Sequence, residues 1–332
     1  MTPDHAQKSI TADALDTKIT HCLQAAPRAS FATIGAVLGV SEQTVARRFR
    51  RLRAAGAVRV IAFVDPTPFG RQSWLLRIFC RPDAAMKVGK ALAIRDDVQW
   101  VALMDGGTQV GCVLRPRTQD AQDQLLLRQL PRTVQITRIE AASVIHVFRG
   151  STTRDWRLGE DFLTEEQEAK LAESTVPRTG RRVTLTDQDN PLLRTLMADG
   201  RATYAELRSA AGADWTEARI RRRVNELREA GVLYFDVDVD DAAFGNPLSA
   251  QLRLSVTPAR LQSVGDAICK HPAVRFCGAT TGSASITMSV GFDGVESLYR
   301  FVSEDVGRLD GVVQVHVGSI NRVLKRAGTI VE

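Results

Sequence analysis

Apolar residues recur at helical spacing in two separate stretches of the chain, one near the N-terminus and one after residue 186. Residues on one face of an α-helix return every three or four positions, so each stripe predicts an amphipathic helix with one buried face. The stripes consist of Leu15, Ile19 and Leu23 in the first stretch and Leu192, Leu193 and Leu196 in the second.

Two further helices are predicted after the first stripe. Ser30 is a suitable N-cap for the segment FATIGAVL, and Gly39 suits the left-handed conformation that ends many helices. Ser41 then caps a longer helix over residues 41–56. Its predicted buried face consists of Val45, Phe49 and Leu52. The corresponding capping and terminating positions of the second stretch are Thr203, Gly212 and Thr216.

The period of the pattern changes from helix to strand after these helices. Segments rich in apolar and β-branched residues, separated by two amphipathic segments, predict the order β-α-β-β-α-β, which is the ferredoxin-like arrangement. The predicted strands cover residues 72–80, 98–104, 110–114 and 134–148, and the predicted helices cover 83–94 and 119–130. The same order is predicted again over residues 248–324.

The two stretches are copies of one unit. Leu52, Ala55-Gly56 and Phe69-Gly70 recur as Leu227, Ala230-Gly231 and Phe244-Gly245, a constant shift of 175 positions. The fold class is therefore α+β, with two tandem units, each a winged helix-turn-helix followed by a ferredoxin-like βαββαβ sheet domain. The predicted order is a helix-turn-helix over 1–70, a sheet domain over 71–148, a linker over 149–186, a second helix-turn-helix over 187–245 and a second sheet domain over 246–327.

The linker between the copies is rich in charged residues, Ser, Thr and Gly. Thr164, followed by Glu165-Glu166 and an Ala/Leu stretch to Leu171, predicts one short helix inside it.

Composition is that of a globular protein, with 44% hydrophobic and 25% charged residues over 332 positions. No apolar run approaches the ~20 residues that cross a bilayer, and the N-terminus lacks the apolar core of a signal peptide. A cytoplasmic protein without membrane contact is expected. The formal charge of +6 is compatible with a polyanionic partner. The five cysteines stand singly in apolar segments, which favours buried thiols over disulfides or a zinc site.

The helix-turn-helix signature gives a specific resemblance. Residues 48–56 and 223–231 both read R-h-x-x-L-x-x-x-G, each followed by a strand, Phe-Gly and a βαββαβ unit. This chain resembles the Lrp/AsnC family of feast/famine regulators, in a double-length tandem form. The resemblance implies assembly through the sheet domains and an amino acid or similar small effector bound at their interfaces.

Double-stranded DNA is the expected partner of the two capped helices, because the N-terminal residues of such a helix can meet base edges in the major groove. Bases or phosphates near the helix start are expected to meet Ser41, Gln43, Thr44 and Arg47, while Arg48 and Arg51 are expected to hold phosphates. The candidates of the second copy are Thr216, Arg219, Arg222 and Arg223.

The effector pocket of the family is expected at the loop between the second and third strands of each sheet domain. The matching residues here are Asp105, Gly106 and Gly107 in the first copy and Thr281 and Gly282 in the second. The family's aspartate after the glycine is absent from both copies, so these glycines are also explained by hairpin turns.

An enzyme is the main alternative class, and little in the sequence favours it. The histidines are scattered and no catalytic, metal-binding or cofactor-binding motif is found. The aspartates at 236, 238, 240 and 241 alternate with apolar residues, which predicts a strand with one wet face.

A second alternative is an effector-sensing or protein-interaction module in which DNA binding by the second half is degenerate. The second helix-turn-helix has a turn longer by two residues and carries more acidic residues, so the first is expected to dominate DNA recognition. The two sheet domains are expected to pair with each other as an internal pseudo-dimer, with further homo-oligomers.

Overall fold

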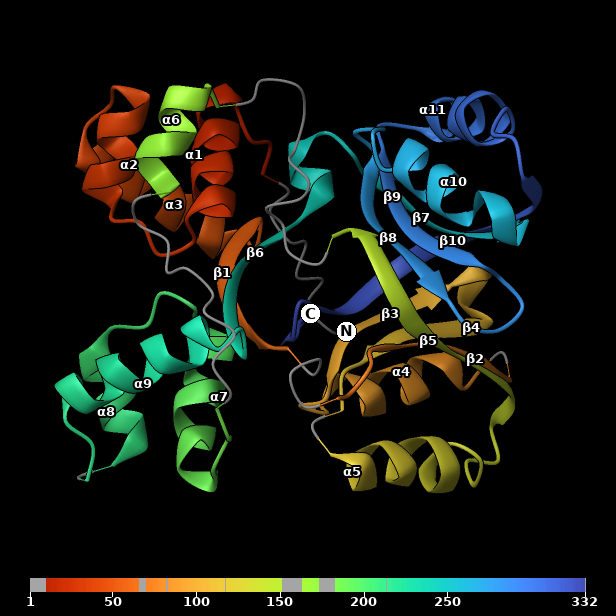
Figure 1. Cartoon of the computed structure of the whole chain (residues 1–332), viewed down its shortest axis with the longest axis horizontal. Coiled ribbons are helices and arrows are strands. Elements are labelled where there is room, and N and C mark those ends of the chain that lie inside the picture. Colours follow the sequence, from red (N-terminus) through yellow and green to blue (C-terminus); the bar gives the residue numbers. More distant parts are fainter. Residues whose placement is uncertain are drawn as a thin grey trace, which may run out of the picture. The chain divides into compact units, whose positions relative to one another are not determined.

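The computed structural model groups the predicted segments in pairs. It describes residues 10–65, 70–81, 83–116, 118–150, 163–172, 183–212 and 214–331. Two compact units are found, and each combines a segment from either copy: residues 1–64 with 152–247, and residues 65–151 with 248–332. The first unit holds both helical segments, and the second holds both βαββαβ segments (Figure 1). Within the described ranges, none of the helices is both long and apolar enough to cross a membrane.

The first unit repeats one order of elements. Three helices and a strand are followed, later in the chain, by three helices and a strand in the same sequence (Figure 1). The first set is α1 (Ala14–Ala25), α2 (Phe31–Leu38), α3 (Glu42–Ala54) and β1 (Val58–Val64). The second set is α7 (Asn190–Ala198), α8 (Tyr204–Ala211), α9 (Glu217–Glu229) and β6 (Leu233–Val239). Short 3-10 helices at Asp187–Asp189 and Asp241–Phe244 precede α7 and follow β6.

The predicted caps begin the helices as expected. The hydroxyl of Ser30 accepts a hydrogen bond from the N–H of Thr33 at 2.9 Å, and Thr203 forms a reciprocal capping box with Glu206. Gly39 ends α2 in the left-handed conformation, with φ 68° and ψ 30°. The prediction for Gly212 is wrong in part, because its φ of 92° is combined with an extended ψ of 178°.

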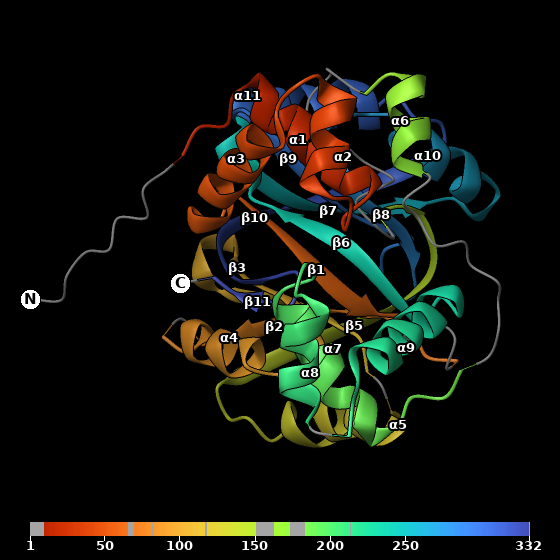
Figure 2. The same cartoon turned by 90° about the vertical axis from the view of Figure 1, so that its left-hand side faces the viewer.

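Strands β1 and β6 form a two-stranded antiparallel ribbon that joins the two helical sets, as Figure 2 shows. The prediction of a wet face on β6 is wrong, because Asp236 and Asp238 are both buried. Arg59 lies opposite Asp238 in the register and donates to its carboxylate at 2.8 Å. Asp238, which the alternating pattern predicted to face solvent, thus forms a cross-strand ion pair instead.

Two equivalent arginines, one in each helical set, donate hydrogen bonds to the backbone of the other set. Arg28 donates to the carbonyl oxygens of Gly200 (2.6 Å) and Ala202 (3.1 Å), and Arg201 donates to those of Pro27 and Ala29, both at 2.9 Å. Arg28 also stacks on the ring of Phe235 and Arg201 on that of Phe31. These reciprocal bonds fix each helical set to the other.

A buried aspartate anchors the third helix of each set. Asp16 is fully buried in α1 and pairs with Arg48 of α3 at 3.0 Å. Asp189 is 1% exposed, and Arg223 of α9 holds it with two bonds of 2.8 Å. Burial raises the pKa of Asp189, but the bonds from Arg223 and Thr186 outweigh it, and the pKa lies below its ordinary value.

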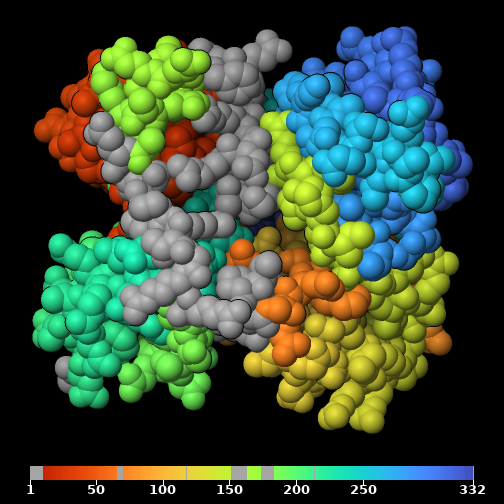
Figure 3. All heavy atoms as spheres, in the orientation of Figure 1, coloured from red at the N-terminus to blue at the C-terminus, as the bar shows by residue number. Residues whose placement is uncertain are grey.

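The predicted linker helix is confirmed as α6 (Glu165–Ala172). Thr164 and Gln167 cap it reciprocally, and Leu171 is completely buried in the core beneath α1 and α2. The amide of Gln167 donates to the carbonyl oxygen of Val37 at 3.0 Å. Figure 3 shows the light green atoms of α6 against the red atoms of the N-terminal helices.

The second unit consists of two βαββαβ sets. The first is β2 (Trp74–Cys80), α4 (Ala85–Ala93), β3 (Val98–Met104), β4 (Gln109–Leu114), α5 (Gln119–Asp123) continued by a π-helix at Gln124–Gln129, and β5 (Ile136–Arg149). The second is β7 (Leu248–Val256), α10 (Leu261–Ile268), β8 (Val274–Thr280), β9 (Ile286–Phe292), α11 (Val295–Arg300) continued by a π-helix at Phe301–Val306, and β10 (Val312–Arg326), with β11 (Thr329–Ile330) at its end. Short 3-10 helices lie at Asp105–Gly107 and Pro258–Arg260.

The two long strands β5 and β10 connect the sets. The first part of β5 pairs with β2 and its second part pairs with β8, while β10 pairs with β7 and then with β3. The strand order therefore closes on itself, and two separate apolar cores lie between the strands and the helices of each set. This is the internal pairing of sheet domains that the duplicated sequence predicts.

We expect Arg223→Gln to lower the free energy of unfolding of the first unit by about 2 kcal/mol, because a buried carboxylate loses its bidentate partner. The depressed pKa of Asp189 means that the pair stabilises the fold above the ordinary value of 3.8 and that this contribution is lost as the pH falls through the lower folded value. The stability gap between the wild type and the variant should close below pH ~4.

Urea unfolding at several pH values, followed by far-UV circular dichroism, measures this gap. Arg222→Gln is the matched control, since its side chain is 76% exposed and lies 3.7 Å from Glu226. Equal midpoints for the two variants at pH 7 would contradict a structural role for Arg223.

Candidate nucleic-acid interface and effector loops

The turn between α2 and α3 is tight because two backbones approach closely. A Cβ at Gly35 would lie 2.6 Å from the carbonyl oxygen of Val40, so only glycine fits this position of α2. The hydroxyl of Ser41 accepts from the N–H of Thr44 at 3.1 Å and begins α3. Only Gly39, Val40 and Ser41 separate the two helices. This geometry is that of a helix-turn-helix.

The outward face of α3 is polar and basic. The predicted contacts Ser41, Gln43 and Arg47 are exposed, and Thr44 is partly buried beside its cap. Arg50 is exposed on the same face and is not among the contacts predicted from the sequence. Its spacing of three residues from Arg47 was the available signal.

Arg48 and Arg51 have partners inside the protein. Arg48 is 21% exposed and its guanidinium group lies 2.6 Å from Asp13 and 3.0 Å from Asp16. The bond from Arg48, together with the N–H of Asp16, lowers the pKa of Asp13. Arg51 also pairs with Asp16 but keeps 46% of its side chain exposed. The two arginines predicted to hold phosphates therefore lie in different environments.

The turn before α9 is longer. Residues 212–216 separate α8 from α9, and Trp215 within this turn is 6% exposed. Arg219 stacks on the Trp215 ring at 4.2 Å and donates to the carbonyl oxygen of Asp214 and to Gln188. Thr216 caps the helix through the N–H of Arg219 at 3.2 Å. The inserted residues Asp214 and Trp215 thus hold one of the predicted DNA contacts, Arg219, in local packing.

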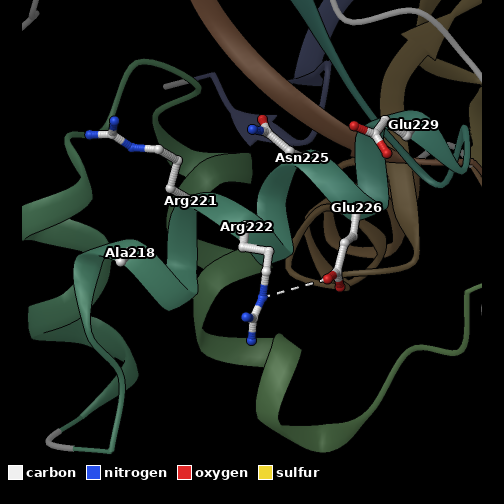
Figure 4. A pocket seen from close by; sticks show the side chains of 6 residues that line it. All are labelled: Ala218, Arg221, Arg222, Asn225, Glu226 and Glu229. Carbon is white, nitrogen blue, oxygen red and sulfur yellow. Dashed lines mark ion pairs between the residues drawn. The ribbon is translucent and has the colours of Figure 1, made fainter.

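The exposed face of α9 borders a shallow hollow (Figure 4). Arg222 lies on this face beside Glu226, and their side chains form an ion pair at 3.7 Å. Arg223, the fourth predicted contact, is turned toward Asp189. The residues that line the hollow are Ala218, Arg221, Arg222, Asn225, Glu226 and Glu229.

The predicted effector residue Asp105 lies in a strained hairpin turn between β3 and β4. Asp105 has a left-handed φ of 50°, a backbone conformation that is uncommon for residues other than glycine. Its carboxylate accepts from the N–H of Ser319 on β10 at 2.9 Å and from the amide of Gln109 at 2.6 Å. Next to it, the N–H of Gly106 donates to Asn321 at 2.8 Å, and Gly107 follows with φ 82°. Contacts with the opposite βαββαβ set hold this strain in place.

The loop of the second set makes the equivalent contact with a neutral side chain. The hydroxyl of Thr281 accepts from the N–H of Ser143 on β5 at 2.9 Å, and Gly282 is exposed. Ser143 and Ser319 are equivalent, because each precedes the residue that pairs with the end of β8 or β3. Both predicted effector loops therefore lie where a long strand crosses between the sets.

Known protein families match parts of both units. The AsnC-type helix-turn-helix domain matches residues 13–53, which cover α1, α2 and all of α3 except Ala54, and the Lrp/AsnC ligand binding domain matches residues 249–330. An uncharacterised HTH-type transcriptional regulator of Pyrococcus horikoshii is 30% identical over 152 residues, 46% of this chain and 94% of that protein. A regulator of the same description from Pyrococcus abyssi is 30% identical over 146 residues, 44% of this chain and 91% of that protein.

A solved structure is similar over almost the whole chain. The crystal structure of the siroheme decarboxylase NirDL matches with a TM-score of 0.63 over 94% of this chain and 92% of that chain, at 14% sequence identity. At this identity the likeness shows a shared fold, which regulators and enzymes can both use. Because the Pyrococcus horikoshii regulator is matched over nearly its whole length, and both domain types of one family are present, this chain belongs to the Lrp/AsnC family of HTH-type transcriptional regulators.

Proposed function

We propose that this protein is a sequence-specific, DNA-binding transcriptional regulator that carries two tandem copies of the family unit and reads DNA mainly through α3. The observation that carries the proposal is the outward face of a capped recognition helix on which Gln43, Arg47 and Arg50 are exposed together. Guanidinium and amide groups at this place match base edges and phosphates of the major groove. The family's helix-turn-helix match covers this helix except for its last residue.

The equivalent face of α9 supports a lesser role for the second copy. At the constant shift of 175 positions, Arg50 and Arg51 correspond to Asn225 and Glu226. Ala54 corresponds to Glu229. The charged residues that line the hollow in Figure 4 are therefore two arginines, Arg221 and Arg222, and two glutamates, Glu226 and Glu229. Carboxylates repel the phosphate backbone, and a face without net positive charge releases few counterions.

In this proposal Arg48 and Arg223 stabilise the fold and do not contact DNA. Each holds a buried aspartate of a preceding helical segment, Asp16 or Asp189, in both copies. A guanidinium group used in this way fixes the recognition helix, and it leaves phosphate binding to Arg50 and the half-exposed Arg51 and base reading to Arg47.

The ribbon of β1 and β6 supports paired binding sites. Reciprocal bonds of Arg28 and Arg201 hold the two helical sets in a fixed relation, as a dimer of single-copy regulators would do with two chains. We propose that one chain therefore replaces a dimer, that chains associate further into oligomers, and that a small effector, an amino acid or a related molecule, adjusts DNA affinity.

Arg47→Ala should weaken binding to the preferred duplex by about 1–3 kcal/mol and relax its sequence preference, whereas Arg50→Ala should weaken all sequences equally and reduce the salt slope by about one. The duplex is first selected from random sequences, and fluorescence anisotropy at two salt concentrations then measures affinity. Gln43→Ala is a third variant, expected to change preference without changing the salt slope.

Arg222→Ala on α9 is the matched control for Arg47→Ala, because the two positions are equivalent. It should change affinity by no more than about twofold. If Arg47→Ala binds the selected duplex as tightly as the wild type does, α3 is not the reading helix.

Removing the acidic residues of α9 should raise affinity for duplex DNA of any sequence. We expect the double variant Glu226→Gln, Glu229→Gln to bind severalfold more tightly at low salt and with a steeper salt dependence, because the outward face of α9 that lines the hollow then carries net positive charge. The intact chain is needed for this measurement, since isolated halves lack the strand partners β1–β6, β5–β8 and β10–β3.

The double variant Glu165→Gln, Glu166→Gln makes the same change of charge on the exposed side of α6. An equal gain of affinity in this control would show a general charge effect and would remove the special role given to the α9 carboxylates.

A further inference from the structure

The strand faces opposite the helices carry a cluster of arginines in the second unit. Arg77 of β2 lies 2.8 Å from Glu140 of β5, and Arg253 of β7 reaches the same carboxylate oxygen at 3.2 Å. Arg138 of β5 pairs with the other oxygen of Glu140. Strands β2 and β7 belong to different βαββαβ sets, so one carboxylate receives guanidinium groups from both sets.

The two sets differ in the residue that lies opposite the equivalent arginines. The strand register places Arg77 opposite Glu140 and places the equivalent Arg253 opposite His316. The second set therefore has an imidazole where the first has a carboxylate, and Arg253 reaches across to the other set for its anionic partner. Three guanidinium groups thus contact a single carboxylate.

Two arginines of this cluster are poorly solvated. The side chains of Arg77 and Arg253 are 15% and 17% exposed. Burial lowers the pKa of Arg253, and the neighbouring charge of Arg77 lowers it further, against the opposite effect of Glu140. Excess positive charge in such a place is unfavourable unless an anion compensates it.

The groups have donors to spare for such an anion. A guanidinium group has five N–H donors in a planar fork that matches carboxylate and phosphate oxygens. In the bonds described, Arg253 uses one nitrogen, and Arg77 uses two, for Glu140 and for Gln109 at 2.6 Å. Arg138 keeps 61% of its side chain exposed, which places it at the rim of the cluster.

We propose that Arg77 and Arg253, with Arg138 at the rim, bind a small oxyanion, a carboxylate or a phosphate group, in competition with Glu140. The inference deepens the proposed function and rests on it only in naming this ligand as the effector. Ligand binding would disturb the chain of bonds from Arg77 through Gln109 to Asp105, whose carboxylate holds the crossing strand β10.

The experiment measures thermal unfolding and calorimetric binding of the full chain with sodium phosphate or sodium succinate, against sodium chloride at equal ionic strength. Both oxyanions should raise the melting temperature with saturation, as a ligand specific for the folded state does. A response to succinate alone identifies a carboxylate site, and a response to phosphate alone identifies a phosphate site.

Two variants give opposite results if the site is correct. Arg253→Gln should weaken binding at least tenfold, because it removes the arginine that has no carboxylate opposite it. Glu140→Gln should strengthen binding several-fold, because it removes the internal competitor while leaving the arginines. The second variant keeps the test decisive if the first does not fold.

Two controls remove an equal charge elsewhere. Arg308→Gln changes an arginine of the same unit that is 77% exposed, and Arg47→Gln changes the proposed DNA face. Both should bind the oxyanion as the wild type does. Loss of binding in Arg47→Gln would move the anion to α3 and overturn the proposal, as would unchanged binding in Arg253→Gln and Glu140→Gln together. Absence of any oxyanion effect in the wild type also overturns it.

Affinity for the selected duplex is measured on the same preparations. Intact DNA binding without oxyanion binding would overturn this site and leave the proposed regulator standing. Oxyanion binding without DNA binding would support this site and overturn the proposed regulator.

Discussion

Hydrogen bonding between strands from the two copies is the constraint on which the rest of this structure depends. Among the strands that the structure describes, β1 pairs with β6 alone, and the long strands β5 and β10 each complete their ladders on the opposite set. A two-stranded ribbon is marginal in water by itself, and an unpaired edge invites association with other chains. Each copy therefore leaves backbone groups open that the other copy satisfies, and the two cannot be treated as separate modules.

The pairing between copies holds the backbone symmetric, while side chains at equivalent positions differ. Contacts that support the fold occur twice: a buried aspartate with an arginine of the third helix, and an arginine that donates to two carbonyl groups of the other set. Solvent-facing positions diverge, as in Arg51 against Glu226, and so do inner-face positions, as in Glu140 against His316. A duplicated chain can thus keep one frame and assign different chemistry to its halves.

Local patterns in the sequence predicted the elements well. Ser30, Ser41, Thr203 and Thr216 each cap a helix as expected, because a capping bond spans only three residues. Contacts between segments far apart in the sequence could not be predicted from such local patterns. The partners of Arg48 lie 35 and 32 residues away, and the alternation of β6 gave no sign that Arg59 would pair with Asp238. On the face of α3 that is proposed to bind DNA, Arg50 is exposed and Arg48 is partly buried. This difference depends on tertiary packing, which helical spacing does not report.

The connectivity of the chain offers a route from the arginine cluster to the recognition helices. Strand β2, which carries Arg77, is the next element after β1, and β7, which carries Arg253, follows β6 after one short 3-10 helix. A ligand that draws Arg77 and Arg253 together acts on the two strands that continue from the ribbon, and the ribbon holds both helical sets. Such a ligand changes DNA affinity only if it binds two states of the protein with different affinity. The competition with Glu140 supplies that difference, because a state in which Glu140 has released the arginines binds the oxyanion more tightly than a state in which it holds them.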